Sequence, residues 1–198
     1  MTILQMQYSY STINWVTATG ALGSDYTERS SSFTVSATGG SGPITYSIVT
    51  GSINPGQTLN PNTGAISGIA TTVANWSSAT YNFTIRATDS GTFVDRAFSY
   101  IIASRYVGYS CSSAGEGGTC SGTAPGAYNF IRRDFSSYGT PGGSCGAFTY
   151  SGCNSGSSNA WNPTPCKSYS VAANNGTWGD PCGGTVKRMY VQLSYGPF

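Results

Sequence analysis

The six cysteines of this 198-residue chain lie only in its second half, and this asymmetry constrains its folding more than any other feature. The first is Cys111 and the last is Cys182, whereas residues 1–104 contain none. A composition shift this sharp predicts two domains, 1–104 and 105–198, joined at Ser104–Arg105–Tyr106. Six cysteines in so short a segment are typical of a disulfide framework. Each bridge would stabilise a small, glycine-rich core by about 2–4 kcal/mol.

The low charge of the chain excludes several classes of function. Charged residues make up 8% of it and histidine is absent. Ser-His-Asp or Cys-His nucleophile systems and His-ligated metal sites therefore cannot form. No cysteine pair has the C-x2-C spacing of a zinc site, so we expect no bound metal. Together with the low charge and the missing histidine, this leads us to expect a protein that has no cofactor and is not an enzyme. A glycan-cleaving enzyme needs paired carboxylates, and the second domain offers only Glu116, Asp134 and Asp180.

The sequence also lacks patterns for nucleic acid, membrane or export. Its nine basic residues are dispersed apart from Arg132–Arg133 and Lys187–Arg188, so we do not expect nucleic acid as a partner. No apolar run approaches the roughly 20 residues of a membrane span, so we expect no membrane insertion. Residues 1–15 contain no Lys or Arg and no unbroken apolar stretch, which predicts no signal peptide. Because disulfides belong to oxidising compartments, one interpretation is a protein assembled in a cytoplasm that works outside it, such as a virion component. The alternative is that a signal has been removed.

Alternation of apolar and polar residues predicts β-strands in the first domain. We expect strands at residues 32–38, 44–50, 81–88 and 97–103. Gly, Pro, Asn and Asp cluster between them and favour turns, and no segment has a sustained helical period. Short strands separated by regular turn signals predict an immunoglobulin-like antiparallel β-sandwich.

Residues 43–68 and 81–91 resemble the immunoglobulin-like domains that recur in bacterial surface proteins and phage virion proteins. The resemblance rests on a turn at residues 53–60 and on a Thr-Gly-x-Ile-x-Gly motif at residues 63–68. It implies a spacer or adhesion module without catalytic residues. The opening segment, residues 7–23, resembles the start of phage fibre proteins.

The run 168–196 resembles the galactose/rhamnose-binding lectins of the sea-urchin-egg-lectin (SUEL) type. The late motif of that family is matched in this chain by Asn175, Trp178, Gly179, Asp180, Pro181, Cys182, Gly184, Thr185 and Lys187. The early Tyr-Gly-Arg motif is matched by Tyr138–Gly139, with Thr140 in place of the arginine. The resemblance covers most of the second domain. It implies a disulfide-rich, mostly β, lectin-like fold with at most a short helix.

The lectin resemblance also implies disulfide pairs. By analogy with the family we expect the bridges Cys111–Cys145 and Cys153–Cys182, which leave Cys120 and Cys166 to pair with each other. The chain departs from the family at Ser112, where the family has a sugar-binding glutamate; the nearest acid is Glu116. The last cysteine of the family, expected near Tyr195–Gly196, is missing.

The same resemblance implies a carbohydrate site. Asp180 would accept hydrogen bonds from two sugar hydroxyls, Asn175 would donate and accept, and Lys187 would donate as a point charge. Tyr138 would pack against the apolar face of the sugar and donate through its hydroxyl, and Glu116 is the acid nearest to the missing glutamate. Each residue has a structural alternative: Asp180 as a turn cap, Asn175 as half of an Asn-Gly turn, and Lys187 as a solvated charge.

The leading hypothesis is a non-enzymatic phage virion protein of the tail-fibre or receptor-binding type. Its lectin-like domain would bind a galactose- or rhamnose-like host surface glycan from the virion surface, beside other virion proteins. Such attachment works by avidity, so we expect a homo-oligomer, for example a trimer in a fibre. One alternative is a structural capsid or tail decoration protein that does not bind sugar. Another is a secreted lectin or adhesin.

Overall fold

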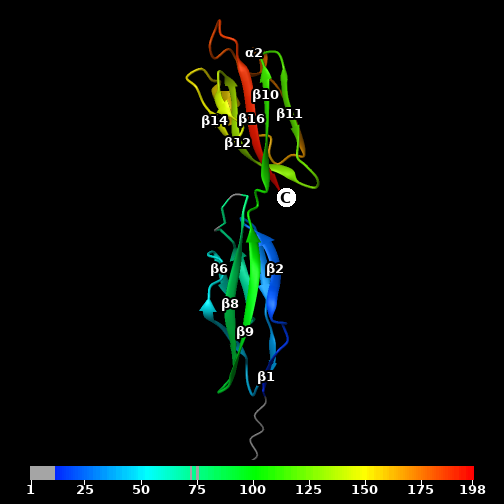
Figure 1. Ribbon diagram of the computed structural model, residues 1–198, viewed down its shortest axis with the longest axis vertical. Helices are drawn as coiled ribbons and strands as arrows, with labels where there is room; N and C mark the ends of the chain where they lie inside the picture. The colour runs from blue at the N-terminus through cyan, green and yellow to red at the C-terminus, as the bar shows by residue number, and fades with distance from the viewer. Residues whose placement is uncertain (1–11, 72, 75) are drawn as a thin grey trace, which may run out of the picture. The chain divides into compact units, whose positions relative to one another are not determined.

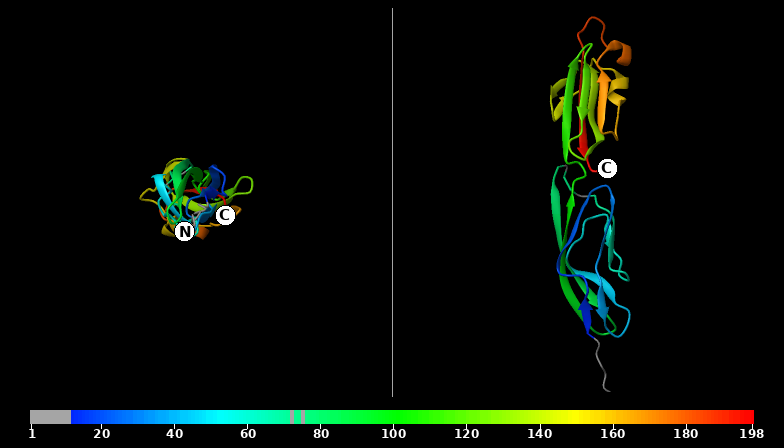
Figure 2. Two further views of the ribbon diagram at one scale, coloured as in Figure 1. Left: turned by 90° about the horizontal axis from the view of Figure 1, so that it is seen from below. Right: turned by 90° about the vertical axis from the view of Figure 1, so that its right-hand side faces the viewer.

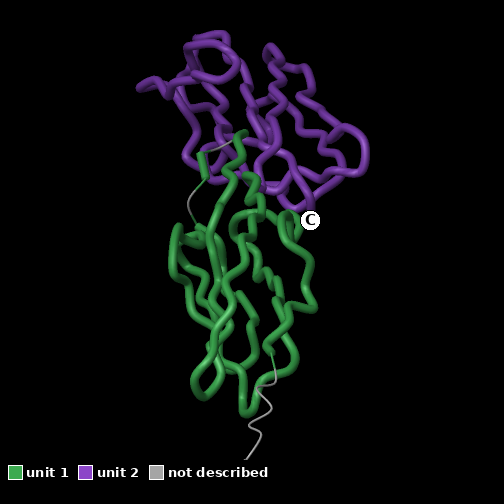
Figure 3. The backbone as a smooth tube through the Cα atoms, turned by 60° about the horizontal axis from the view of Figure 1, so that its bottom comes forward, with its two compact units in different colours: residues 1–104 green, residues 105–198 purple. Residues whose placement is uncertain are grey.

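The computed structural model describes residues 12–71, 73–74 and 76–198, which form two compact units that divide between Ser104 and Arg105 (Figure 3). Residues 1–11, which include most of the segment used to predict the absence of a signal peptide, lie outside the described residues. The predicted mainly β fold is confirmed, since the regular structure of these described residues consists of strands and two short helices (Figure 1). Among the described residues, no helix has both the length and the apolar character that a membrane crossing requires.

The first unit is a sandwich of two β-sheets with a small additional strand pair. The larger sheet has the order β2 (Gly20–Tyr26), β9 (Phe93–Ala103), β8 (Ser78–Thr88) and β5 (Thr45–Gly51). The smaller sheet has the order β3 (Ser30–Thr34), β7 (Ala65–Ile69) and β6 (Gln57–Leu59), and β1 (Ile13–Trp15) pairs with β4 (Ala37–Gly39). The right-hand view in Figure 2 shows the two larger sheets as separate layers.

Alternate side chains along the strands fill the core of this sandwich. From Phe83 onward in β8 and from Phe98 onward in β9, every second side chain is buried, including Ile85 and Tyr100. The ring of Tyr100 stacks on Phe33 of the facing sheet, with 4.6 Å between ring centroids. The predicted strands at 81–88 and 97–103 are therefore confirmed.

Two details of the first unit differ from the prediction. The strand expected at 32–38 ends at Thr34. The amide of Val35 still donates to the carbonyl of Gly64 at the next position of the β3–β7 register, but the amide of Gly64 donates to the carbonyl of Asn60 in a turn, so the ladder goes no further. The sandwich is not wholly antiparallel either, because β2 pairs with β9 in parallel. These two strands are far apart in sequence, so no tight hairpin forces them to run in opposite directions.

A buried polar network ties the loop before β6 to the larger sheet. The hydroxyl of Tyr100 accepts from the backbone amide of Asn54 and donates to Oε1 of Gln57, both at 2.7 Å. Nε2 of Gln57 then donates to Oγ of Ser31 at 2.6 Å. All four residues are buried, so each bond satisfies a polar group that would otherwise have lost its water partner.

The second unit has a three-stranded sheet at its centre. Its order is β10 (Gly108–Gly115), β16 (Arg188–Gly196) and β12 (Asn129–Gly139), all antiparallel. The remaining elements are the pair β11 (Thr119–Thr123) and β15 (Ser168–Ala172), the hairpin β13 (Gly142–Ser144) and β14 (Ala147–Thr149), and the helices α1 (Gly156–Ala160) and α2 (Asn175–Trp178).

The central strand β16 has two different faces. Met189, Val191 and Leu193 are fully buried in a core cluster that includes side chains of β11 and β15. Tyr190 and Gln192 alternate with them and so lie on the opposite face. There the β13–β14 hairpin covers part of the sheet, and the amide of Gly146 donates to Oε1 of Gln192 at 3.0 Å. We call this second side the hairpin face.

Two disulfides fasten loops to this framework. Cys111–Cys145 joins β10 to the β13–β14 hairpin, and Cys153–Cys182 joins the segment before α1 to the loop before β16. These are the two pairs that the lectin resemblance implies.

The expected third bridge is absent, because Cys120 and Cys166 carry free thiols. The register of β11 and β15 places Cys120 opposite Val171, which is five residues along the chain from Cys166. At a strand rise of about 3.3 Å per residue this separates the two cysteines by roughly 16 Å, whereas bridged Cα atoms lie within about 7 Å. The thiol of Cys120 instead donates to the carbonyl of Met189 at 3.3 Å.

Candidate functional site

A hollow of about 300 Å³ lies where β10 ends and β16 begins. Four of the five residues predicted to bind carbohydrate line it: Glu116, Asn175, Asp180 and Lys187. The rest of the lining is the segment 184–186, which belongs to the late motif of the lectin resemblance but had no assigned role. We call this site the charged hollow.

Lys187 forms the centre of the charged hollow and is buried, with 3% of its side chain exposed. Its Nζ lies 2.9 Å from Oδ1 of Asp180 and donates to the carbonyl of Thr185 at 2.8 Å. Oε2 of Glu116 lies 4.0 Å from the same nitrogen. The interpretation of Lys187 as a solvated charge is therefore wrong, because the ammonium is held between two carboxylates.

Glu116 reaches the charged hollow from the turn that follows β10. Its amide donates to the carbonyl of Lys187 at 3.0 Å, and the amide of Lys187 donates to Oε2 of Glu116 at 3.2 Å. Gly117 continues the turn with a φ of 86°, a conformation that glycine adopts without a steric penalty. Ser112, which stands where the family has its glutamate, donates to or accepts from the hydroxyl of Tyr169 at 2.9 Å instead.

Asn175 is presented to the charged hollow by the single turn of α2. The side chain of Asn174 caps this turn by accepting from the amide of Thr177 at 2.8 Å. Oδ1 of Asn175 accepts from the hydroxyl of Tyr138 at 2.9 Å, which leaves its Nδ2 donors available to a ligand.

The predicted role of Tyr138 as a sugar platform is wrong. The side chain is fully buried in the core cluster of the second unit, so its ring cannot meet a ligand. Burial and the nearby charge of Glu116 both raise the pKa of its hydroxyl, which keeps it a neutral donor to Asn175. Tyr138 is thus a positioning residue that fixes the orientation of the Asn175 amide.

Asp180 is the most accessible charge of the hollow, with 46% of its side chain exposed. Its Oδ1 accepts from the amide of Cys182 at 3.2 Å, so the turn-cap alternative is also correct. The Cys153–Cys182 bridge anchors the same turn. Oδ2 faces no hydrogen-bond donor among the described residues that lie around it, and it can accept from a ligand.

The charge pair at the hollow gives a prediction about pH. The hydrogen bond from Lys187 lowers the pKa of Asp180, and Asp180 in turn raises the pKa of Lys187. The ion pair therefore stabilises the fold fully at pH values above the ordinary aspartate pKa of about 3.9. This stabilisation is lost as the pH falls through the lowered pKa that Asp180 has in the folded protein. On the alkaline side it is complete below about 10.4 and is lost as pH rises through the raised pKa of Lys187.

We expect an NMR titration of the side-chain carboxyl carbons to place the Asp180 midpoint below that of an unpaired aspartate. In the variant Lys187→Gln the midpoint should move upward. An Asp180 midpoint that does not change in this variant would contradict the ion pair.

In chemical terms the charged hollow combines hydrogen-bond acceptors, donors and an apolar edge. The carboxylates of Glu116 and Asp180 accept, and the amide of Asn175 donates. Val186 lines the same hollow with 79% of its surface exposed. Trp178 is not part of it, because its Nε1 donates to the carbonyl of Ala172 at 2.7 Å and its ring packs on the core. Vicinal hydroxyl groups next to an apolar ring face fit this combination.

Within the described ranges, no three His, Cys, Asp or Glu side chains gather closely enough to hold a metal ion. Asp134, the remaining acid of the second unit, is paired with Arg132 at 2.7 Å and accepts from Ser194 at 2.5 Å. It does not line the charged hollow.

The sequence profile of the family described as "Putative Ig domain" matches residues 12–104. This range coincides with the described part of the β-sandwich. The first unit is an immunoglobulin-like domain. The predicted carbohydrate-binding residues all lie in the second unit, and none lies in the immunoglobulin-like domain.

Similarity to individual proteins is local. Beta-galactosidase 8 from Arabidopsis thaliana is 40% identical over 63 residues, which are 30% of this chain and 7% of that protein. The chain thus spans a small part of the curated relative that it matches.

Two solved structures illustrate the structural matches. A SusE-like, surface-located polysaccharide-binding protein from Bacteroides thetaiotaomicron has a TM-score of 0.37 at 16% identity, over 48% of this chain and 16% of that one. The extracellular domain of protocadherin GammaB4 has a TM-score of 0.36 at 13% identity, over 58% and 18%. Both scores are too low to establish a shared fold.

Proposed function

We propose that the second unit binds a neutral saccharide in the charged hollow. The observation that carries the proposal is the convergence of Glu116, Asn175 and Asp180 around the buried ammonium of Lys187. Lys187 holds both carboxylates in place, so their remaining lone pairs are oriented before a ligand arrives. Preorganised acceptors reduce the entropy cost of binding a flexible polyol.

The charge of the hollow favours neutral over anionic glycans. Two carboxylates surround one ammonium, and that ammonium already has two hydrogen-bond partners. A carboxylated or sulfated sugar would therefore meet excess negative charge. A galactose- or rhamnose-like residue, which offers hydroxyl donors to both carboxylates, is the substrate class that fits.

The arrangement supports binding rather than glycoside hydrolysis. A glycosidase needs one carboxylic acid whose raised pKa keeps it protonated as the general acid. In the charged hollow, the contact with Lys187 instead lowers the pKa of Asp180. We therefore propose a protein without enzymatic activity.

The biological setting that we propose is the surface of a phage particle, with attachment to host glycans. Two disulfides are typical of proteins that work outside the cytoplasm, and residues 43–68 and 81–91 resemble modules of phage virion and bacterial surface proteins. A virion proteome or immunogold labelling of particles tests this setting. If the chain is instead found in the medium of cells that carry no phage, it is a secreted lectin or adhesin.

The binding proposal is tested by the variant Asp180→Asn. It removes the exposed carboxylate but keeps the size of the side chain. Because charged hydrogen bonds contribute about 1.5–3 kcal/mol each, we expect at least tenfold weaker binding. Isothermal titration with methyl galactoside and methyl rhamnoside, guided by a glycan array, measures the change.

The matched control is Asp95→Asn, which removes an ion-paired aspartate of similar exposure in the immunoglobulin-like domain. It should bind like the parent. Equal affinity of the Asp180→Asn variant and the parent would contradict the proposed site. Absence of any glycan binding by the parent would favour the alternative, a structural decoration protein.

A further inference from the structure

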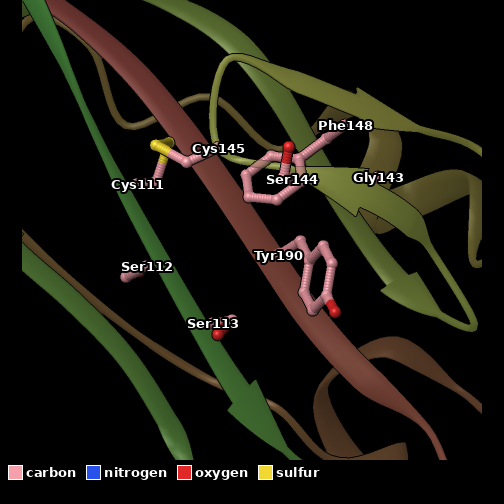
Figure 4. A pocket seen from close by; sticks show the side chains of 8 residues that line it. All are labelled: Cys111, Ser112, Ser113, Gly143, Ser144, Cys145, Phe148 and Tyr190. Atoms are coloured by element: carbon pink, nitrogen blue, oxygen red, sulfur yellow. A yellow bond between two sulfur atoms is a disulfide. The ribbon is translucent and has the colours of Figure 1, made fainter.

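A second hollow of about 300 Å³ lies on the hairpin face, outside the charged hollow (Figure 4). Its lining includes Ser113 from β10, Ser144 and Phe148 from the β13–β14 hairpin, and Tyr190 from β16. The Cys111–Cys145 disulfide forms one end. We call this site the aromatic groove.

Strand register explains why these side chains share one face. Ser113 lies directly opposite Tyr190, and Cys111 lies opposite Gln192. Residues two apart on a strand point to the same side, so Cys111 and Ser113 both belong to the hairpin face. Ser112, between them, faces the core cluster, where its hydroxyl meets Tyr169. The bridge from Cys111 then holds the hairpin over one part of the face and leaves the part next to Ser113 open.

Aromatic rings form the wall of the groove. The rings of Phe148 and Tyr190 are 4.8 Å apart between centroids and tilted by 49°. Phe135 supports Phe148 from β12 at 5.5 Å, and Tyr150 continues the cluster at 4.5 Å from Phe135, with 50% of its surface exposed. Rings held in this way present a rigid apolar surface, and little side-chain entropy is lost when a ligand packs on it.

Hydroxyl groups supply the polar part of the groove. Within the described part of the chain, the hydroxyls of Ser113, Ser144 and Tyr190 make no hydrogen bond to another protein group, so each can both donate and accept. No ionised side chain is among the residues that line the groove. The lining therefore suits a ligand that is neutral, rich in hydroxyls and apolar on one face.

We propose that the aromatic groove is a second carbohydrate site, which takes one neutral sugar ring. The ring would stack on Phe148 and Tyr190 and exchange hydrogen bonds with the hydroxyls of Ser113 and Ser144. This site shares no lining residue with the charged hollow and does not depend on the function proposed there. Because no charge is involved, its affinity is independent of salt concentration.

The test uses the full chain with the Asp180→Asn substitution, so that the charged hollow is weakened. Methyl galactoside, methyl rhamnoside and methyl glucoside are titrated separately, and amide chemical shifts are followed by NMR. We expect at least one glycoside to shift the amides of Ser113, Ser144 and Phe148, with the same apparent affinity at low and high salt. If none of the three shifts these amides, the proposal is overturned, whatever happens at Thr185 and Val186 in the parent chain.

Two variants then locate the bound sugar. Ser113→Tyr fills the open part of the groove, and Phe148→Leu removes a ring while it keeps an apolar side chain against Phe135. Each should weaken binding at least tenfold. The matched control is Ser121→Tyr, which places the same bulk on an exposed serine of β11 and should bind like the parent. Binding that survives both groove variants would overturn the proposal, and Ser113→Tyr keeps the test valid if Phe148→Leu fails to fold.

Discussion

Replacing Cys111 and Cys145 by serine is expected to lower the free energy of unfolding of the second unit by about 4 kcal/mol. The bridge joins residues 34 positions apart, and the chain-entropy relation assigns a loop of this length that contribution. The loss should be confined to residues 105–198, since the bridge lies within that unit. Hydrogen exchange measured peptide by peptide distinguishes the second unit from the immunoglobulin-like domain.

The control for this prediction is the pair of substitutions Cys120→Ser and Cys166→Ser. Because these two thiols are unbridged, their replacement removes no crosslink and should cost far less than loss of the Cys111–Cys145 bridge. Alkylation of the unfolded, unreduced chain should add two labels, which mass spectrometry counts. A count of zero, with strong destabilisation in the control, would restore the third bridge and contradict the register of β11 and β15.

The variant Tyr100→Phe is expected to destabilise the immunoglobulin-like domain by about 3 kcal/mol. The substitution keeps the ring that stacks on Phe33 but leaves the amide of Asn54 and Oε1 of Gln57 buried without a partner. Each orphaned buried group costs about 1–3 kcal/mol. Urea unfolding, followed by hydrogen exchange of peptides from β6 and β9, measures the loss.

The variant Tyr46→Phe serves as a comparison, because it should lose less stability than Tyr100→Phe. The hydroxyl of Tyr46 accepts one hydrogen bond, from the amide of Ala37 at 2.9 Å, and its loss should cost about 1 kcal/mol. If the two variants were equally stable, the polar network around Tyr100 would not contribute as its geometry indicates.

Much of the fold follows from local patterns. The strands around Phe83 and Phe98 were predictable because every second residue is apolar and one sheet face is buried. The end of β3 at Thr34 was not, because it depends on its partner strand, far along the chain, where the amide of Gly64 donates to the carbonyl of Asn60 in a turn. The parallel pairing of β2 with β9 was also beyond prediction, since partner choice between distant strands is not encoded in either strand alone.

In the candidate site, too, the features set by local sequence were predictable and those set by contacts between distant residues were not. The motif around Asp180 and Lys187 identified the charged hollow, because short-range spacing sets the turn that presents both residues. The role of Tyr138 could not be read from the sequence, since burial depends on how β12 packs. The free thiols of Cys120 and Cys166 likewise depend on strand register. The aromatic groove had no sequence signal, because it forms only where the hairpin folds over Tyr190.

The Cys111–Cys145 bridge also makes the attachment of the β13–β14 hairpin depend on the redox conditions around the protein. Cys145 is exposed to solvent, and the bridge is the covalent link that holds the β13–β14 hairpin against β10. In a reducing cytoplasm that link is not expected to persist. The wall of the aromatic groove that the hairpin forms is therefore held covalently only under oxidising conditions.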